Sequence, residues 1–303
     1  MSALMRLIAL LFGLGHAAAI AAIHLDDAGR QVDIASPPQR IITIAPNLTE
    51  LVYAVGAGAA LIGTVDTSDY PQGAKAVPRI GNAERLDIER IVSLKPDLIL
   101  VWLHGNPGRE VAQLEAAGLR LFYLEPRRLD DVPRAIERVG ALLGHEAQGR
   151  DAAADLRKAL NMLRETHANA APVTVFYQVW SQPLMTLNDQ HLVSDVIALC
   201  RGRNVFGALP QLVPQLSIES VVAADPEAMF TASEFATVGP QWRRDPKHRA
   251  FATWSRFAKL TAVRRGWMFA MAGDVLNRQG PRIAQGAAAA CAALDEVRKE
   301  RGR

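Results

Sequence analysis

Cysteine is scarce in this chain, which holds only Cys200 and Cys291 among its 303 residues. Zinc sites built on cysteine use short, repeated spacings, so this widely separated pair excludes such a site. In an oxidising compartment the pair can form one disulfide, which would restrict a loop of about ninety residues. The alternative is two separate buried thiols.

Catalytic motifs are absent too. The sequence contains no G-x-S-x-G elbow, phosphate-binding loop, dinucleotide fingerprint or H-E-x-x-H pattern. We therefore expect no enzyme, no catalytic residue and no cofactor. The seven histidines are too scattered for a bare zinc or manganese ion, so we expect no metal site made by the protein alone. His104, two residues after Trp102, could still serve as an axial ligand of a chelated metal.

A strong charge of one sign is also missing, since the formal net charge is +3. Basic residues gather at Arg243-Arg244, Arg264-Arg265 and 299–303, but no aromatic residues alternate with them. This pattern is typical of a solvated surface, so we expect no nucleic-acid partner. No segment after residue 22 is long and apolar enough to cross a membrane.

The N-terminus has the pattern of an export signal over residues 1–22. Arg6 precedes an apolar stretch from Leu7 to Leu14, and small residues follow at Ala17-Ala-Ala19. A membrane anchor is the alternative, although the apolar stretch is short for a bilayer. We therefore expect a soluble mature protein in the periplasm.

One segment of the chain occurs twice. Residues 86–100 and 216–230 are identical at five of fifteen positions, at a constant offset of 130. In each copy Asp87 or Ser217 can cap a short helix, a proline ends it, and a buried strand follows. A second pair, 48–58 and 192–202, matches at an offset of 144. The repeats predict two similar lobes with a cleft between them.

Strand and helix patterns alternate on both sides of an Ala-, Leu-, Arg- and Glu-rich helical segment. We predict an α/β fold of two similar three-layer lobes with parallel central sheets, joined by one long backbone helix. The expected N-terminal lobe is 23–145, the connecting helix 146–171 and the C-terminal lobe 172–303. Because one helix resists bending more than extended crossovers do, we expect the lobes to close by only a small angle.

Several segments in this order resemble the periplasmic substrate-binding proteins of the helical-backbone class, and within it the cobalamin-binding branch. They are 40–51, 68–71, 86–102, 196–206 around Cys200, and 281–283 leading to Cys291. The resemblance implies a monomeric solute-binding protein that delivers cobalamin or a related corrinoid to the permease dimer and ATPase subunits of an ABC importer. The alternative ligand is a ferric siderophore or haem, for which Arg278, Arg243 and Arg244 are the available cations.

The resemblance also implies a ligand site made by loops at the strand ends. Trp102 and Trp180 could form flat walls for a corrinoid, unless they are ordinary packing. Asp274 and Arg278 are the expected polar contacts, with a surface salt bridge between them as the alternative. Three expected aromatic positions hold other residues. The full set of predicted ligand-binding residues is Pro46, Asn47, Thr67, Asn82, Ala83, Trp102, Trp180, Val213, Asp274 and Arg278.

Glu89 and Glu219 occupy equivalent positions in the two copies of the repeat. The resemblance implies that they meet arginines on the two permease subunits. A carboxylate in the first turn of a helix is also favoured by the helix dipole, which is the alternative explanation. Since the dipole alone does not explain the match between lobes, we predict docking.

Overall fold

The computed structural model describes residues 22–82, 84–233 and 242–302. The predicted export signal lies outside these ranges up to residue 21, and Ala83 lies outside them as well. None of the helices in these ranges is long and apolar enough to span a membrane.

The first lobe is built on a parallel sheet whose strand order is β4-β3-β5-β6. Its strands are apolar and covered on both faces, as parallel strands usually are. An antiparallel hairpin of β1 (Ala22–Leu25) and β2 (Gln31–Ile34) precedes the sheet. The sheet strands are β3 (Ile41–Thr43), β4 (Leu61–Thr64), β5 (Leu98–Trp102) and β6 (Leu121–Leu124). The α-helices are α1 (Pro46–Ala54), α2 (Ile88–Ser93), α3 (Gly108–Ala116) and α4 (Asp131–Leu142).

The second lobe has a sheet of order β10-β7-β11-β13-β12, in which only β12 is antiparallel. The sheet strands are β7 (Val173–Gln178), β10 (Gly202–Asn204), β11 (Ala228–Ser233), β12 (Trp242–Arg244) and β13 (Met268–Ala272). A small hairpin pairs β8 (Trp180–Ser181) with β9 (Leu184–Met185). The helices are α6 (Leu192–Leu199), α7 (Ile218–Ala224), the 3-10 helix η3 (Arg249–Arg256), α8 (Thr261–Arg265), α9 (Gly273–Leu276) and α10 (Ile283–Arg301).

The two sheets share one topology. When the parallel strands of each sheet are numbered in chain order, both sheets have the strand order 2-1-3-4. The repeated segments occupy equivalent places: β5 starts at residue 98 and β11 at residue 228. Each repeat helix is capped as predicted, since the Asp87 side chain accepts from the Arg90 amide and the Ser217 hydroxyl from the Ser220 amide. The prediction of two similar α/β lobes is confirmed.

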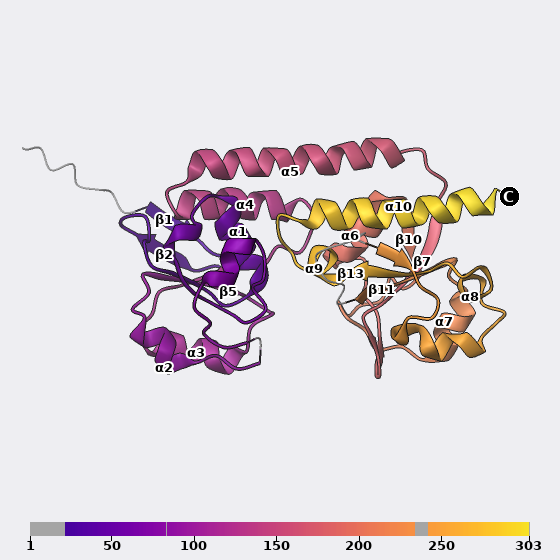
Figure 1. Ribbon diagram of the computed structural model, residues 1–303, viewed down its shortest axis with the longest axis horizontal. Helices are drawn as coiled ribbons and strands as arrows, with labels where there is room; N and C mark the ends of the chain where they lie inside the picture. The colour runs from indigo at the N-terminus through magenta and orange to yellow at the C-terminus, as the bar shows by residue number, and fades with distance from the viewer. Residues whose placement is uncertain (1–21, 83, 234–241, 303) are drawn as a thin grey trace, which may run out of the picture.

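A single long helix, α5 (Glu146–His167), connects the lobes. Its 22 residues extend over about 33 Å at the usual rise per residue. Figure 1 shows α5 along one side of both lobes, with α4 folded back beneath its first half. Gly140 of α4 lies against Gly149 of α5, and a Cβ added to Gly140 would lie 2.9 Å from the Gly149 Cα. Glycine at this contact therefore allows the two helix backbones to approach closely.

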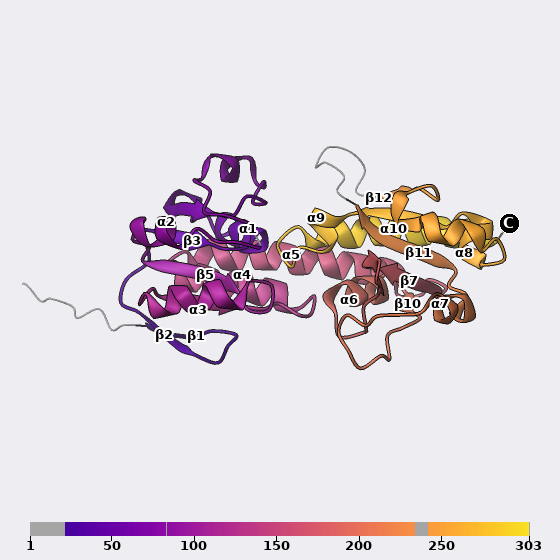
Figure 2. The ribbon, with the colours of Figure 1, turned by 90° about the horizontal axis from the view of Figure 1, so that it is seen from below.

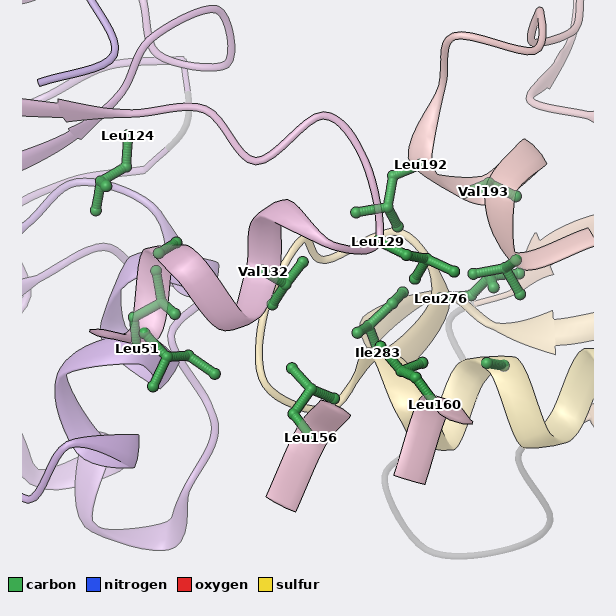
Figure 3. Close-up of a cluster of buried hydrophobic side chains, with 14 of the residues drawn as sticks. Leu51, Leu124, Leu129, Val132, Leu156, Leu160, Leu192, Val193, Leu276 and Ile283 are labelled. Atoms are coloured by element: carbon green, nitrogen blue, oxygen red, sulfur yellow. The ribbon is translucent and has the colours of Figure 1, made fainter. Parts of the chain in front are cut away.

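The lobes also share one apolar core. A single cluster of buried side chains runs from the sheet of the first lobe, through α4 and α5, to α6 and α10 of the second. Figure 3 shows Leu129, which follows β6, beside Leu192 of α6, with Leu160 of α5 and Ile283 of α10 in the same group. The helix is therefore supported by packing on both sides, which favours a stiff junction.

Cys200 and Cys291 form a disulfide that joins the end of α6 to α10. Both residues are buried, and the bond lies wholly within the second lobe. The prediction of a bridge is confirmed, and the alternative of two free thiols is wrong. A native disulfide of this kind typically stabilises a folded chain by about 2–5 kcal/mol.

Candidate functional site

A buried ion pair connects the two lobes. The Arg282 guanidinium donates from Nε and Nη2 to the two carboxylate oxygens of Glu50, at 3.0 and 2.6 Å. Glu50 lies on α1 in the first lobe, and its side chain is only 2% exposed. The two-pronged geometry is the strongest that arginine makes with a carboxylate. Burial alone would lower the pKa of Arg282, but the hydrogen bonds and charge of Glu50 outweigh it and raise that pKa.

Arg278 makes a second connection between the lobes. Its Nη1 donates to Asp69 at 2.7 Å and to Glu50 at 3.2 Å, while Nη2 donates to the Thr67 carbonyl at 3.2 Å. Burial would raise the pKa of Asp69, yet the bond and charge of Arg278 hold that pKa below its usual value. Arg278 thereby holds the 67–69 loop of the first lobe against the loop after α9.

Asp274 pairs with Arg282, at 2.8 Å between Oδ2 and Nη1, and no ion pair is found between Asp274 and Arg278 in the described residues. The alternative of a surface salt bridge between those two is therefore wrong. The Arg282 guanidinium also lies 4.0 Å from the centre of the Tyr70 ring, a cation–π arrangement. The junction thus brings Thr67 together with Asp274 and Arg278, and Asn47 lies beside the Gly280 backbone of the second lobe.

Several buried polar atoms, at this junction and at the end of β5, have no hydrogen-bond partner among the described residues. They are both polar side-chain atoms of Asn47, the Trp102 Nε1, the Asp274 Oδ1 and the Gln279 Oε1. An unpaired buried polar group costs about 1–3 kcal/mol. Four of these five atoms belong to three predicted ligand-binding residues, Asn47, Trp102 and Asp274, so most of the unpaired polar atoms coincide with the predicted site.

Four hydroxyls beneath the junction bond to one another. The Oγ atoms of Thr43, Thr49, Thr64 and Ser68 are fully buried and lie 2.7–2.9 Å apart in five pairs. We call this group the hydroxyl cluster. It ties α1 to the ends of β3 and β4 and to the loop that carries Asp69.

On the second-lobe side, the predicted residues occupy an exposed hairpin and loop. Trp180 is 61% exposed and Val213 is 36% exposed, so Trp180 is not core packing. The 3-10 helix η3 and the start of α7 line a pocket of about 550 Å³ beside this hairpin. Its lining residues are Gln178, Ser181, Gln182, Pro183, Leu184, Leu216, Ile218, Ala252, Thr253 and Arg256.

The remaining predicted residues have varied settings. Pro46 begins α1, where a proline is well tolerated. Trp102 ends β5 and is half-buried, and its ring lies where a Cβ on Gly105 would be, so Gly105 leaves it room. Asn82 is exposed, and its side-chain Oδ1 accepts hydrogen bonds from the backbone amides of Glu84 and Arg85. This oxygen is therefore used within the turn that contains Asn82.

The two predicted docking residues lie on the same side of the molecule. Glu89 on α2 and Glu219 on α7 are exposed, and neither forms an ion pair within the described ranges. Figure 1 places both helices on the side away from α5, one on each lobe. In Figure 2, seen from that side, α2 and α7 lie near opposite ends of the molecule.

Sequence reasoning missed Glu50 and Arg282. The only charged residue of α1 was an available signal for Glu50, because a carboxylate buried in such a helix needs a partner. Nothing local indicated that its partner is 232 residues away. Across the described part of the chain, no cluster of three or more His, Cys, Asp or Glu side chains is placed to hold a metal ion.

Comparison with known proteins agrees with this architecture. The model of a family described as periplasmic binding protein matches residues 41–274. The chain belongs to the periplasmic binding protein family. This family points to a binding role rather than catalysis.

Among its relatives, this binding protein is 35% identical to a vitamin B12-binding protein of Vibrio cholerae over 264 residues, covering 87% of this chain and 92% of the relative. The crystal structure of the periplasmic vitamin B12-binding protein of Vibrio cholerae matches with a TM-score of 0.75 at 34% identity, over 87% of this chain and 99% of that one. A periplasmic haem-binding protein from Roseiflexus sp. RS-1 matches with a TM-score of 0.71 at 25% identity, over 84% and 98% of the two chains. The predicted family resemblance is confirmed.

Proposed function

We propose that this chain captures a corrinoid, cobalamin or a close relative, between its lobes and delivers it to an ABC importer. The observation that carries the proposal is the 35% identity to a vitamin B12-binding protein along 92% of that relative. Residues 1–22 would direct export, so that the mature chain works in the periplasm. It would act there as a monomer. The corrinoid is cargo, and no resident cofactor is part of the proposal.

The chemistry of the junction supports a ligand with amide arms. A corrinoid is broad and largely apolar, with amides at its rim, so it needs an aromatic wall and a few hydrogen-bonding groups. Exposed Trp180 supplies a wall, and Asn47 has an unpaired amide. The unpaired Asp274 and Gln279 oxygens are acceptors, which suit amide N–H donors better than carboxylates.

The charge of the site argues against the alternative ligands. Catecholate siderophores and the propionates of haem are anionic and call for free cations. The three arginines named as candidates hold carboxylates of the protein: Arg278 pairs with Asp69, Arg243 with Asp245, and Arg244 with Glu296 and Glu300. A corrinoid is therefore favoured over these anions.

Delivery requires contact with the importer. We propose that Glu89 and Glu219 meet cationic side chains on the two permease subunits, because both are exposed, unpaired with any base of the described residues, and carried at equivalent places on the two lobes. A pseudo-twofold pair of charges suits a symmetric dimer.

Calorimetric titration with cyanocobalamin, dicyanocobinamide, haem and a ferric catecholate tests the ligand class. We expect a corrinoid to bind at micromolar concentration or below, with the two anionic chelates much weaker. Trp180→Ala should weaken corrinoid binding about tenfold through the loss of its aromatic face. Met162→Ala, on the exposed side of α5, is the matched control and should bind as the unmodified chain does. Binding of haem or siderophore with no corrinoid bound would overturn the proposal.

A further inference from the structure

The repeat within this chain acts as an internal comparison of the two lobe ends. Residues 86–97 and 216–227 have nearly the same pattern of exposure, with Ile91 and Val221 fully buried at equivalent positions. Buried positions stay apolar in both copies because each must fill a core. An exposed position beyond the helix cap has no such restraint from the core of the lobe.

Most exposed positions shared by the two copies have indeed diverged. Three residue pairs differ in chemical type: Asp87 and Ser217, Ser93 and Ala223, and Lys95 and Asp225. Two exposed pairs are identical. They are Glu89 with Glu219, and Val92 with Val222.

The two valines are unusual for exposed helix positions. Val92 is 41% exposed and Val222 is 37% exposed, and both belong to the large hydrophobic side chains that the described surface leaves open. Valine is a weaker helix former than many residues and gains nothing from contact with water. Each valine follows its glutamate by three positions, so the two side chains share one helix face.

We propose that Val92 and Val222 are the apolar half of the docking contact, each inserted against an apolar surface beside the cation that meets Glu89 or Glu219. The partner is the symmetric permease dimer. Helices α2 and α7, which carry the two equivalent acidic and apolar pairs, lie on one side of the molecule (Figure 1), and such an arrangement fits a partner with two equivalent sites. This inference rests on the proposed function.

The test uses the full mature chain and the importer of the organism that produces it, held in nanodiscs. Val92→Thr and Val222→Thr keep the shape of the side chain and bury a hydroxyl in the contact. Each should raise the dissociation constant for the importer about tenfold, and the pair more. The double variant Glu89→Gln with Glu219→Gln serves as the reference for loss of charge. Cyanocobalamin affinity and melting temperature should stay unchanged in all of them.

The matched control places threonine at the next exposed position of the same helices, as Ser93→Thr with Ala223→Thr. Equal weakening by this control, or unchanged docking of the valine variants while the glutamate variant fails, would overturn the inference and leave the proposed function standing. Loss of corrinoid binding or of docking by the unmodified chain would instead refute the proposed function. Sedimentation tests whether a second copy of this chain binds the same face. If the unmodified chain forms a dimer that the valine variants abolish, the face binds a second copy and the inference is wrong.

Discussion

Helices α1 and α6 occupy equivalent places in the two lobes, and each carries an acid that holds an arginine from across the junction. On α1, Glu50 binds Arg282 of the second lobe. On α6, Asp195 binds Arg128, which follows β6 of the first lobe, and accepts from the Leu129 amide at 3.1 Å.

Burial separates these two contacts. The side chains of Glu50 and Arg282 are 2% and 8% exposed, whereas those of Asp195 and Arg128 are 15% and 49% exposed. Screening by water leaves an exposed pair with little net energy, while a buried charge that loses its partner is costly. These two similar contacts between the lobes thus have very different energetic weight.

The largest expected effect comes from breaking the buried contact. Arg282→Met should lower the free energy of unfolding by about 3–5 kcal/mol, because Glu50 would remain buried with less compensation. Arg128→Met is the matched control and should cost about 1 kcal/mol or less. Urea unfolding of both variants measures the difference. Equal costs would show that burial does not distinguish the two contacts.

Protonation of His191 should make the stability of the second lobe depend on pH in a way that the first lobe does not. His191 caps α6, and burial lowers its pKa to about 4 from 6.5, whereas the equivalent Asn47 of the first lobe does not titrate. Because the pKa of His191 is lower in the folded state, the neutral imidazole contributes its full stability above pH 6.5. This contribution to the free energy of unfolding is lost as the pH falls toward 4. The expected loss is about 3 kcal/mol.

Urea unfolding between pH 7 and pH 4 measures this slope. His191→Asn keeps a capping side chain and removes the titration, so it should flatten the pH dependence in this window. An unchanged slope in that variant would assign the acid sensitivity to other groups.

The smallest effect is expected in the hydroxyl cluster. Thr49 of α1 is equivalent to Val193 of α6, so Thr49→Val gives the first lobe the residue found in the second. The change should lower the free energy of unfolding by about 1–2 kcal/mol, because Thr43, Thr64 and Ser68 lose a buried partner. Val193→Thr, the reverse change, introduces a buried hydroxyl for comparison. A neutral Thr49→Val would show that the cluster contributes no stability.

Much of the fold was predictable from local patterns. Buried strands, β5 and β11, follow the two repeat helices as predicted, and Asp87 and Ser217 cap those helices. These features depend on neighbours within a few positions, where spacing and residue type carry the information. The predicted site was less complete. Asn82 uses its side-chain oxygen in its own turn, and Asp274 binds Arg282 rather than Arg278.

The sequence by itself determined that the chain has two similar halves, because a repeat with the same caps, stops and strands builds the same unit twice. It also named Thr67, Asp274 and Arg278 at the junction, but not Glu50 or Arg282. Only the tertiary structure decided how the halves are joined, and therefore that Glu50 meets Arg282. Pairing across the junction depends on the relative placement of the two lobes, and that placement follows from packing along α5 and the shared core rather than from any local pattern.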